Sequence, residues 1–451
     1  MRPEKWLFSG NLIIIMCLML ATTLSAADGA KPLSLSESID LALKRSLLIH
    51  VAKEGVRGAE AQKREAFTGF LPKFSTWYSY NKLNEDPYLV FPGIPPVVPA
   101  GTLIVGTRDN YTWAVEARQP IFAGGAILAN YEASSIGADI ARVDESSAVQ
   151  DLVLEAKTAY FNILKADRIL AVAKQSVEQL KAHRDTAQGF YDAGIIPRND
   201  LLQAQVELAN GSQFLLRSEN SLELAKSKFN TILRREINHP VQVEDVLSDR
   251  PFEKTFDGCL AAAMENRPEI RSYALRLEQT KKQVKLTQSE YYPSVNMVGN
   301  YAKYGDTPGV SGSPFKHQES WYVMAVASWN FWEWGRTKNR VEAVESRESQ
   351  AADFLSNIRD QIGLEVKNAF LLLHEAEKQV QVAKKAIEQA EENFRINTER
   401  YEERVGTATE VIDAQTLLTK ARSDWHNALG DFNISRARLE RAMGAARDVS
   451  E

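Results

Sequence analysis

Two carboxylates near the C-terminal end of the chain have a spacing that could carry chemistry. Glu410 and Asp413 follow a short break in a helical pattern, within the segment YEERVGTATEVIDAQ. Residues three apart lie on one face of a helix, and two carboxylates so placed attract cations and repel anions. Acidic side chains also complement the dipole at the start of a helix. From the residues alone, this helix-terminal role is the favoured interpretation.

The other reactive residues form no catalytic or metal-binding pattern. The six histidines are scattered without ligand spacing: His50, His183, His239, His317, His374 and His426. No Ser/His/Asp or Cys/His arrangement stands out, and the glycines that end GTRDNYTWAVEARQPIFAGG lack a phosphate-loop pattern. A formal net charge of −5 does not indicate a nucleic-acid surface. We predict a protein that is not an enzyme, with no cofactor, no metal site and no nucleic-acid partner.

Most of the chain is written twice, which indicates an internal tandem duplication. LEAKTAYFNIL at Leu154 aligns with LEVKNAFLLLH at Leu364, and the match continues without a gap. A second overlay matches residues 35–81 with residues 256–302. Similarity at a fixed offset over such lengths is typical of repeated structural units. We predict a first repeat at 28–237, a linker at 238–254, a second repeat at 255–444 and a tail at 445–451.

Each repeat contains a long heptad pattern. Large apolar residues alternate with alanines at spacings of three and four, from 156 to 180 in the first repeat and from 366 to 394 in the second. Each pattern breaks once, at DAGIIP or at ERVGT, and then resumes. This predicts helical hairpins at 125–235 and 336–443. At about 1.5 Å per residue, the first arm of each hairpin is roughly 100 Å long.

Four flanking segments alternate between apolar and polar residues. In the second, Tyr111, Trp113 and Val115 share a face opposite Thr112 and Glu116. Such segments, with aromatic residues near their ends, are typical of transmembrane strands, although the strands of a soluble β-sandwich also alternate. Four strands cannot close a barrel, and lipid does not tolerate an open edge, so several copies must assemble. The predicted strands are 73–84, 109–122, 294–304 and 320–332.

The first residues have the layout of a secretory signal peptide. Two basic residues precede an apolar run at 12–20, and small residues follow it. The run is short for a membrane anchor. We predict a signal peptide at 1–27, and after it no stretch that is long and apolar enough for a membrane helix. Cys259 is then the one remaining cysteine, which excludes an internal disulfide.

These features together resemble the TolC-like outer membrane efflux proteins. The resemblance extends over about 36–444, and its motifs are the two hairpin-break segments, QPIFAGG at Gln119 and WNFWEWGR at Trp329. It implies an α+β membrane protein with duplicated half-units, each giving two transmembrane β-strands and a very long helical hairpin. It also implies a homotrimer, with a 12-stranded β-barrel continuous with a 12-helix periplasmic α-barrel.

The resemblance implies a function as well. It implies the outer-membrane channel-tunnel of a tripartite efflux or type I secretion system, in the outer membrane of a Gram-negative bacterium. Such a channel passively conducts what an inner-membrane efflux pump or ABC exporter delivers through a periplasmic adaptor (membrane fusion) protein. The partners are therefore two further copies, the adaptor, the pump and outer-membrane lipid. The transported substrate and the pump class stay open.

The same resemblance gives a role to the hairpin tips. Acidic residues just past the second tip face the lumen of these proteins at its narrowest point, and the matching residues are Glu410 and Asp413. Asp200 occupies the matching place in the first repeat. Three copies would put six carboxylates of Glu410 and Asp413 around one aperture, which would hold cations. The predicted adaptor contacts are Gly194, Ile195, Ile196, Val405, Gly406 and Thr407.

The sequence departs from the family pattern at the residue that closes the mouth. In a well-known member of the family an arginine follows VGT and pairs with the first hairpin, but this chain has Ala408 there. Arg198 and Arg404 are nearby candidates for the gate pairing. The tips also align in two ways, because Tyr191 and Tyr401 need a different offset from Gly194 and Gly406.

A different protein class also carries a long helical hairpin. In a periplasmic adaptor-type coiled-coil protein of the same kind of assembly, one hairpin separates two glycine-rich halves. Two hairpins and four aromatic-flanked strands argue against this alternative. The proline-rich loop at 85–108 is expected at the cell surface, and the sequence does not indicate what it does.

Overall fold

The computed structural model describes residues 32–445. The chain divides into two compact units. Within the described residues, one unit comprises 32–46, 150–256 and 367–445, and the other comprises 47–149 and 257–366. The first unit contains both hairpin tips and the second contains the sheet. The predicted signal peptide lies outside the described residues, as does nearly all of the predicted tail.

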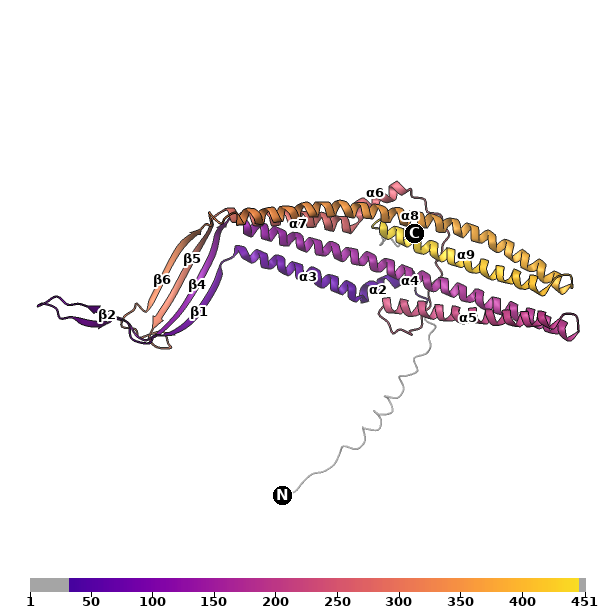
Figure 1. Ribbon diagram of the computed structural model, residues 1–451, viewed down its shortest axis with the longest axis horizontal. Helices are drawn as coiled ribbons and strands as arrows, with labels where there is room; N and C mark the ends of the chain where they lie inside the picture. Colours follow the sequence, from indigo (N-terminus) through magenta and orange to yellow (C-terminus); the bar gives the residue numbers. More distant parts are fainter. Residues whose placement is uncertain (1–31, 446–451) are drawn as a thin grey trace, which may run out of the picture. The chain divides into compact units, whose positions relative to one another are not determined.

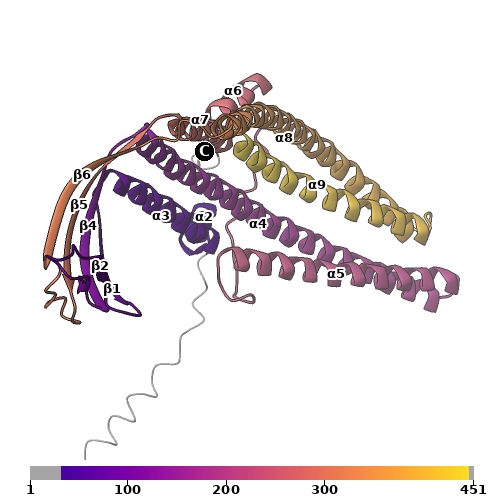
Figure 2. The same ribbon diagram turned by 60° about the vertical axis from the view of Figure 1, so that its left-hand side comes forward.

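Four antiparallel strands form one curved sheet (Figure 2). Their order is β1-β4-β5-β6, and β4 and β5, which belong to different repeats, pair at the centre. The register between them shifts at Pro120, which has no N–H to donate to the ladder. Among the described residues, β1 and β6 each pair on one side only, so the sheet has two open edges. The strands are β1 (Lys73–Lys82), β4 (Asp109–Ala123), β5 (Ser294–Gly305) and β6 (Glu319–Ser328).

The two faces of the sheet differ in polarity. Val115 of β4 lies beside Tyr301 of β5, which lies beside Trp321 of β6. Glu116 lies beside Asn300, and it forms a 3.0 Å ion pair with Arg118 on the same strand. Because side chains alternate along a strand, the first set faces one side and the second set faces the other. An apolar face opposite a polar face is the pattern of a barrel wall between lipid and water.

A helix and one 3₁₀ turn lead into the sheet in each repeat. In the first repeat α3 (Leu47–Phe67) continues through η1 (Thr68–Phe70) into β1. In the second repeat α7 (Pro268–Gln288) continues through η2 (Ser289–Tyr291) into β5. Both connections have the same length and order, as a duplication requires. The helices that precede them are α2 (Leu35–Arg45) and α6 (Phe256–Asn266).

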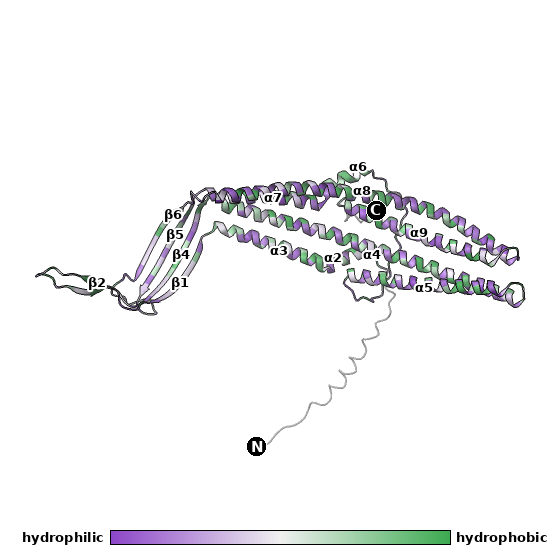
Figure 3. Cartoon of the chain, in the orientation of Figure 1, coloured by the Kyte–Doolittle hydropathy of each residue, from purple (hydrophilic) through white to green (hydrophobic). Residues whose placement is uncertain are grey.

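Two long helical hairpins follow the strands (Figure 1). Polar and apolar residues alternate along them, as Figure 3 shows. On α8 the buried residues are large apolar groups separated by alanines, which lets a neighbouring helix approach closely. Each fully buried large side chain contributes about 1.5–3 kcal/mol to stability. The hairpins consist of α4 (Ala126–Asp192) with α5 (Arg198–Ile232), and α8 (Arg336–Glu402) with α9 (Ala408–Ala442).

The linker is tied to the first repeat by one buried tyrosine. The Tyr160 hydroxyl lies 2.9 Å from the carbonyl oxygen of Leu33 and 2.8 Å from that of Glu244. Leu33 also forms a parallel bridge with Val243. Tyr160 is fully buried, and burial raises the pKa of its hydroxyl to about 12, so it stays a neutral donor.

The coarse fold class, long helices with a few strands, is confirmed. Strands begin within one residue of each of the four predicted starts, but β6 ends at Ser328, so the aromatic segment up to Trp334 lies outside the sheet. The loop expected at 85–108 contains two further strands, β2 (Tyr88–Phe91) and β3 (Gly101–Ile104). Among the described helices, none is long and apolar enough to cross a membrane.

Candidate functional site

The two hairpin tips share one backbone geometry. Gly194 has a φ of +70° and its N–H donates to the Tyr191 carbonyl, 2.9 Å away. Arg404 has a φ of +64° and its N–H donates to the Tyr401 carbonyl, 3.0 Å away. The next N–H donates one residue further back in both tips. This decides between the two possible alignments: Gly194 corresponds to Arg404, and by the same offset Asp200 corresponds to Glu410.

Gly406 therefore has a different task from Gly194. A Cβ at Gly194 would meet nothing within 4 Å, so glycine serves its left-handed backbone. A Cβ at Gly406 would lie 3.1 Å from the Cβ of Arg400 and 3.2 Å from the Tyr401 nitrogen. Gly406 is needed for close approach of the chain to the end of α8, and any side chain there must displace the turn.

The acidic residue Glu410 caps the start of α9. The Thr407 N–H donates to Glu410 Oε2 at 2.9 Å, and the Glu410 N–H donates to Thr407 Oγ1 at 3.3 Å. This capping box satisfies two N–H groups that the helix leaves without partners. The hydrogen bond from the Thr407 backbone, together with Arg400 at 3.9 Å, lowers the pKa of Glu410. The helix-terminal role that the residues alone favoured is thus present, and Glu410 stays ionised.

The other two acidic candidates differ from Glu410. Asp413 lies one turn further along α9, is exposed, and has no hydrogen bond or ion pair within the described residues. Asp200 lies in the first turn of α5 and is half-buried. The pKa of Tyr401 is raised mainly by burial and, to a smaller extent, by the negative charge of Asp200. The structure therefore places Asp413 beside Glu410 on α9, and Asp200 at the contact between the hairpins.

Tyr401 is the centre of that contact. Its ring centroid lies 5.5 Å from that of Phe190 and 5.1 Å from that of His183, both on α4. The first turn of α9 completes the cluster, and Tyr401 is only 4% exposed. Within the described part of the chain, the Tyr401 hydroxyl and the His183 Nε2 are buried without a hydrogen-bond partner. Burial lowers the pKa of His183. This cluster was not predicted from the sequence, since its members are far apart along the chain.

Further from the tips along α4 and α9, polar side chains join the two hairpins. Gln415 of α9 donates to Gln179 of α4 at 2.9 Å, and Thr419 donates to Ser176 at 3.0 Å. Gln415 is 3% exposed. Buried polar contacts of this kind are satisfied in only one alignment of two helices. They therefore fix the register between α4 and α9 more sharply than alanine packing does.

Comparison with known proteins identifies the family. A model described as outer membrane efflux protein matches residues 38–233 and 259–445, which is most of the chain. The chain belongs to the outer membrane efflux protein family. Its relatives include outer membrane protein TolC of Escherichia coli, 18% identical over 66% of this chain, and nodulation protein T of Rhizobium leguminosarum, 19% identical over 71%. The chain spans 62% of the length of the Escherichia coli relative and 69% of that of nodulation protein T.

Solved structures of outer membrane channels share the fold. The outer membrane channel CmeC of Campylobacter jejuni has a TM-score of 0.79 at 18% identity, covering 92% of this chain and 87% of CmeC. The open state of the MtrE channel of Neisseria gonorrhoeae has a TM-score of 0.74 at 18% identity, covering 92% of this chain and 91% of MtrE. The match over nearly the whole of both chains shows that sheet and hairpins together are the family fold.

Within this efflux-protein fold, the two arginines expected at the gate are not paired in the described chain. Arg198 is the first residue of α5, and Arg404 lies in the turn between α8 and α9. Both side chains are exposed. Neither has an ion pair within residues 32–445. Near the tips, the hairpins are joined instead by contacts that include those of Tyr401, Gln415 and Thr419. The gate pairing of the two arginines stays a prediction.

The predicted adaptor contacts fall into two groups. Ile195 and Val405 are 42% and 68% exposed and have no packing role that the structure shows. Ile196 packs against Ala187, Leu201 and Ala204, so it belongs to the core of its tip. Thr407 is the N-cap of α9, as described above. In this efflux protein the exposed apolar pair, Ile195 and Val405, is therefore the sharpest candidate for docking.

Acidification is expected to loosen the contact between the hairpins. A histidine whose pKa is lowered by burial favours the folded state while neutral; this stability is lost as the pH falls below the unfolded value of about 6.5. We expect amide protection of residues 395–412, measured by hydrogen exchange, to fall between pH 7.5 and 5.5 after correction for intrinsic rates. His183→Gln should remove most of this pH dependence. An equal loss of protection in that variant would exclude His183 as the cause.

The described residues contain no group of three or more His, Cys, Asp or Glu side chains that could hold a metal ion. Cys259 is fully buried.

Proposed function

We propose that this protein is the outer-membrane channel-tunnel of a tripartite efflux or type I secretion system. The observation that carries the proposal is the sheet, which is more apolar on one face than on the other and has two open edges among the described residues. A sheet of this kind cannot stand alone in lipid, because its edges expose backbone groups that nothing satisfies. Three copies would close twelve strands into one barrel.

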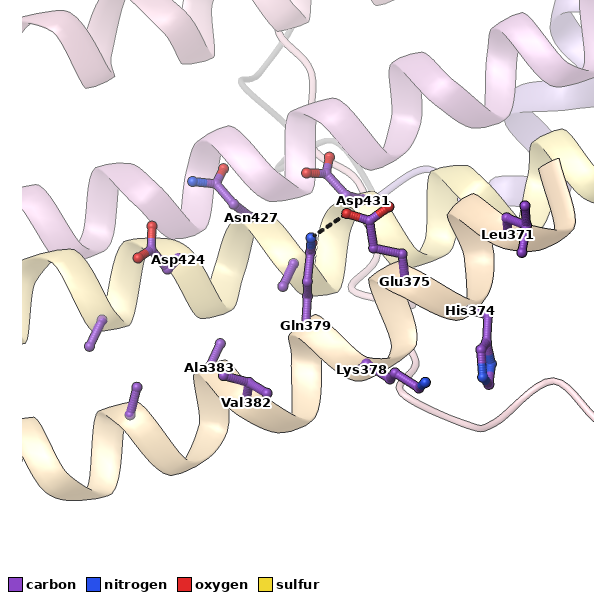
Figure 4. A pocket seen from close by; sticks show the side chains of 13 residues that line it. Leu371, His374, Glu375, Lys378, Gln379, Val382, Ala383, Asp424, Asn427 and Asp431 are labelled. Carbon is purple, nitrogen blue, oxygen red and sulfur yellow. Dashed lines mark hydrogen bonds between the residues drawn. The ribbon is translucent and has the colours of Figure 1, made fainter. Parts of the chain in front are cut away.

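The hairpins also offer surfaces for other copies. A groove of about 810 Å³ runs between α8 and α9 (Figure 4). It is lined by apolar residues such as Leu371 and Val382 and by charged residues such as Glu375 and Lys378. Val206, Leu216 and Leu224 of α5 are also exposed. Exposed apolar strips on helices of one chain support assembly into the twelve-helix barrel expected for a trimer.

The geometry and the family support the partners that we propose. A channel of this class is a passive conduit in the outer membrane of a Gram-negative bacterium. Substrates are delivered by an inner-membrane efflux pump or ABC exporter, and a periplasmic adaptor protein joins the pump to the hairpin tips. The aperture at the tips is formed by Glu410 and Asp413 of each copy, with Asp200 nearby. The adaptor-type alternative is not favoured, because the chain has two hairpins and a four-stranded sheet.

The proposal predicts a trimer in detergent extracts of the membrane. Two open sheet edges and exposed helix strips make the monomer unfavourable. Light scattering combined with size-exclusion chromatography should give a mass of three chains per particle. On gels, the migration of the protein should change when the sample is heated. A monomer that keeps its β-structure would overturn the channel proposal.

A further inference from the structure

The two-stranded ribbon of β2 and β3 has an apolar surface that the proposed channel does not explain. It extends beyond the end of the sheet that is remote from the helices of its unit (Figure 1). From Pro87 to Thr107 the chain contains no charged residue. The exposed side chains include Leu89, Val90, Ile94 and Val97, of which Val97 is 77% exposed. This is far more apolar surface than a loop in water normally shows.

Both faces of the ribbon are apolar. Tyr88 pairs with Ile104, and Leu89 pairs with Leu103. Since successive residues of a strand point to opposite sides, the first pair lies on one face and the second pair lies on the other. A ribbon that merely lies on the protein surface would have one polar face. This ribbon must be covered on both sides.

The base of the ribbon is held in place. The Arg108 N–H donates to Asp86 Oδ1 at 2.8 Å, and the Val105 N–H donates to the Pro87 carbonyl at 2.8 Å. Thr107 Oγ1 donates to Asp306 Oδ1, 2.7 Å away, in the turn between β5 and β6. These bonds fix where the ribbon leaves the sheet. Its direction is therefore a property of the fold, and the same in every copy.

The ribbon could be surrounded by water, by hydrocarbon or by a second ribbon, and these differ in which of its groups they satisfy. Water satisfies the backbone groups on the two outer edges of a ribbon but leaves its apolar faces exposed. Hydrocarbon covers the faces but leaves the edges unsatisfied. A second ribbon can do both, because it offers backbone groups for an edge and apolar side chains for a face. The absence of charge between Pro87 and Thr107 means that identical ribbons do not repel one another.

We propose that the ribbons of neighbouring copies pack against one another and form an apolar constriction at the outer end of the channel. The surface of each ribbon is thus covered by the same segment of a second copy. This inference rests on the proposed trimer, which brings three ribbons to one end of the barrel. It makes the loop an outer gate, separate from the acidic aperture at the helical tips.

Cysteine cross-linking tests this arrangement. Val97→Cys, at the end of the ribbon, should give covalent dimers under mild oxidation in membranes. The matched control is Gly309→Cys, in the exposed turn between β5 and β6 at the same end of the sheet. Cys259 is buried and should not contribute. We expect cross-linked dimer to be about tenfold more abundant in the Val97 variant, because proximity controls the rate.

A conductance measurement adds a functional readout. The double change Val90→Lys with Leu103→Lys places a positive charge on each face, so the ribbons of different copies should separate. Single-channel conductance should then rise about twofold or more. Unchanged conductance, or equal cross-linking in the Val97 and Gly309 variants, in particles that are shown to be trimers, would overturn the constriction while leaving the channel proposal intact.

Two other outcomes would also overturn it. A fluorophore attached to the Val97→Cys variant that is quenched by nitroxide lipids would show that the ribbon lies in the membrane. Absence of the trimer itself would remove the channel proposal and this inference together. Cross-linking with raised conductance in the lysine variant is the result that supports the constriction.

Discussion

Charged substitutions at the two exposed tip residues are expected to abolish efflux without affecting assembly. Val405 and Ile195 are 68% and 42% exposed apolar side chains at the ends of the two hairpins. Val405→Asp and Ile195→Asp would bury an unpaired charge in any interface with the adaptor. A residue central to an interface contributes about 2 kcal/mol or more, so docking should weaken roughly 30-fold. Efflux in cells and the trimer level in the outer membrane are the two measurements.

The controls separate docking from damage to the tip. Val405→Thr keeps size and shape without a charge and should retain most efflux. Gly406→Leu should also abolish efflux, but it forces the turn away from Arg400, so it tests the shape of the tip as well as its surface. Normal efflux in both aspartate variants, at normal trimer level, would exclude the tips as the docking surface.

The sequence predicted those parts of the fold that repeat locally. The heptads of α4 and α8 are visible because large residues and alanines alternate over many turns, and each helix has the same period throughout. The strands are visible for the same reason at period two. The ribbon of β2 and β3 was missed because neither face is polar, so the segments YLVF and GTLI have no alternation to detect.

The tips were harder to predict because backbone geometry there departs from the usual residue preferences. A left-handed turn normally indicates glycine, and the sequence offers Gly406, but the structure places Arg404 in that conformation. The capping box of Thr407 and Glu410 was readable, since a threonine followed three residues later by glutamate is its signature. The cluster around Tyr401 could not be read, because it depends on how two distant hairpins meet.

Removing two charges per chain without removing a cap should reduce the cation preference of the pore. Glu410 closes a capping box, so Glu410→Ala would change helix and charge together. Glutamine also serves at this position of a capping box, so Glu410→Gln removes the charge and keeps the cap. Asp413 is exposed and unpaired in the described chain, and Asp413→Asn is nearly isosteric. The double variant Glu410→Gln with Asp413→Asn therefore tests the charges more cleanly than Glu410→Ala does.

In planar bilayers the wild-type channel should prefer cations, and micromolar trivalent cations should block it from the periplasmic side. Six carboxylates around one aperture repel one another, and a multivalent cation relieves that repulsion. In the double variant, the reversal potential in a salt gradient should move toward zero and the block should weaken at least about tenfold.

A matched control is Glu342→Gln with Glu345→Gln, an exposed pair with the same spacing near the other end of α8. That pair lies roughly 85 Å from the tip along the helix, so it should leave selectivity unchanged. If the tip variant and wild type have identical reversal potentials and identical block, Glu410 acts only as the cap of α9 and the aperture lies elsewhere.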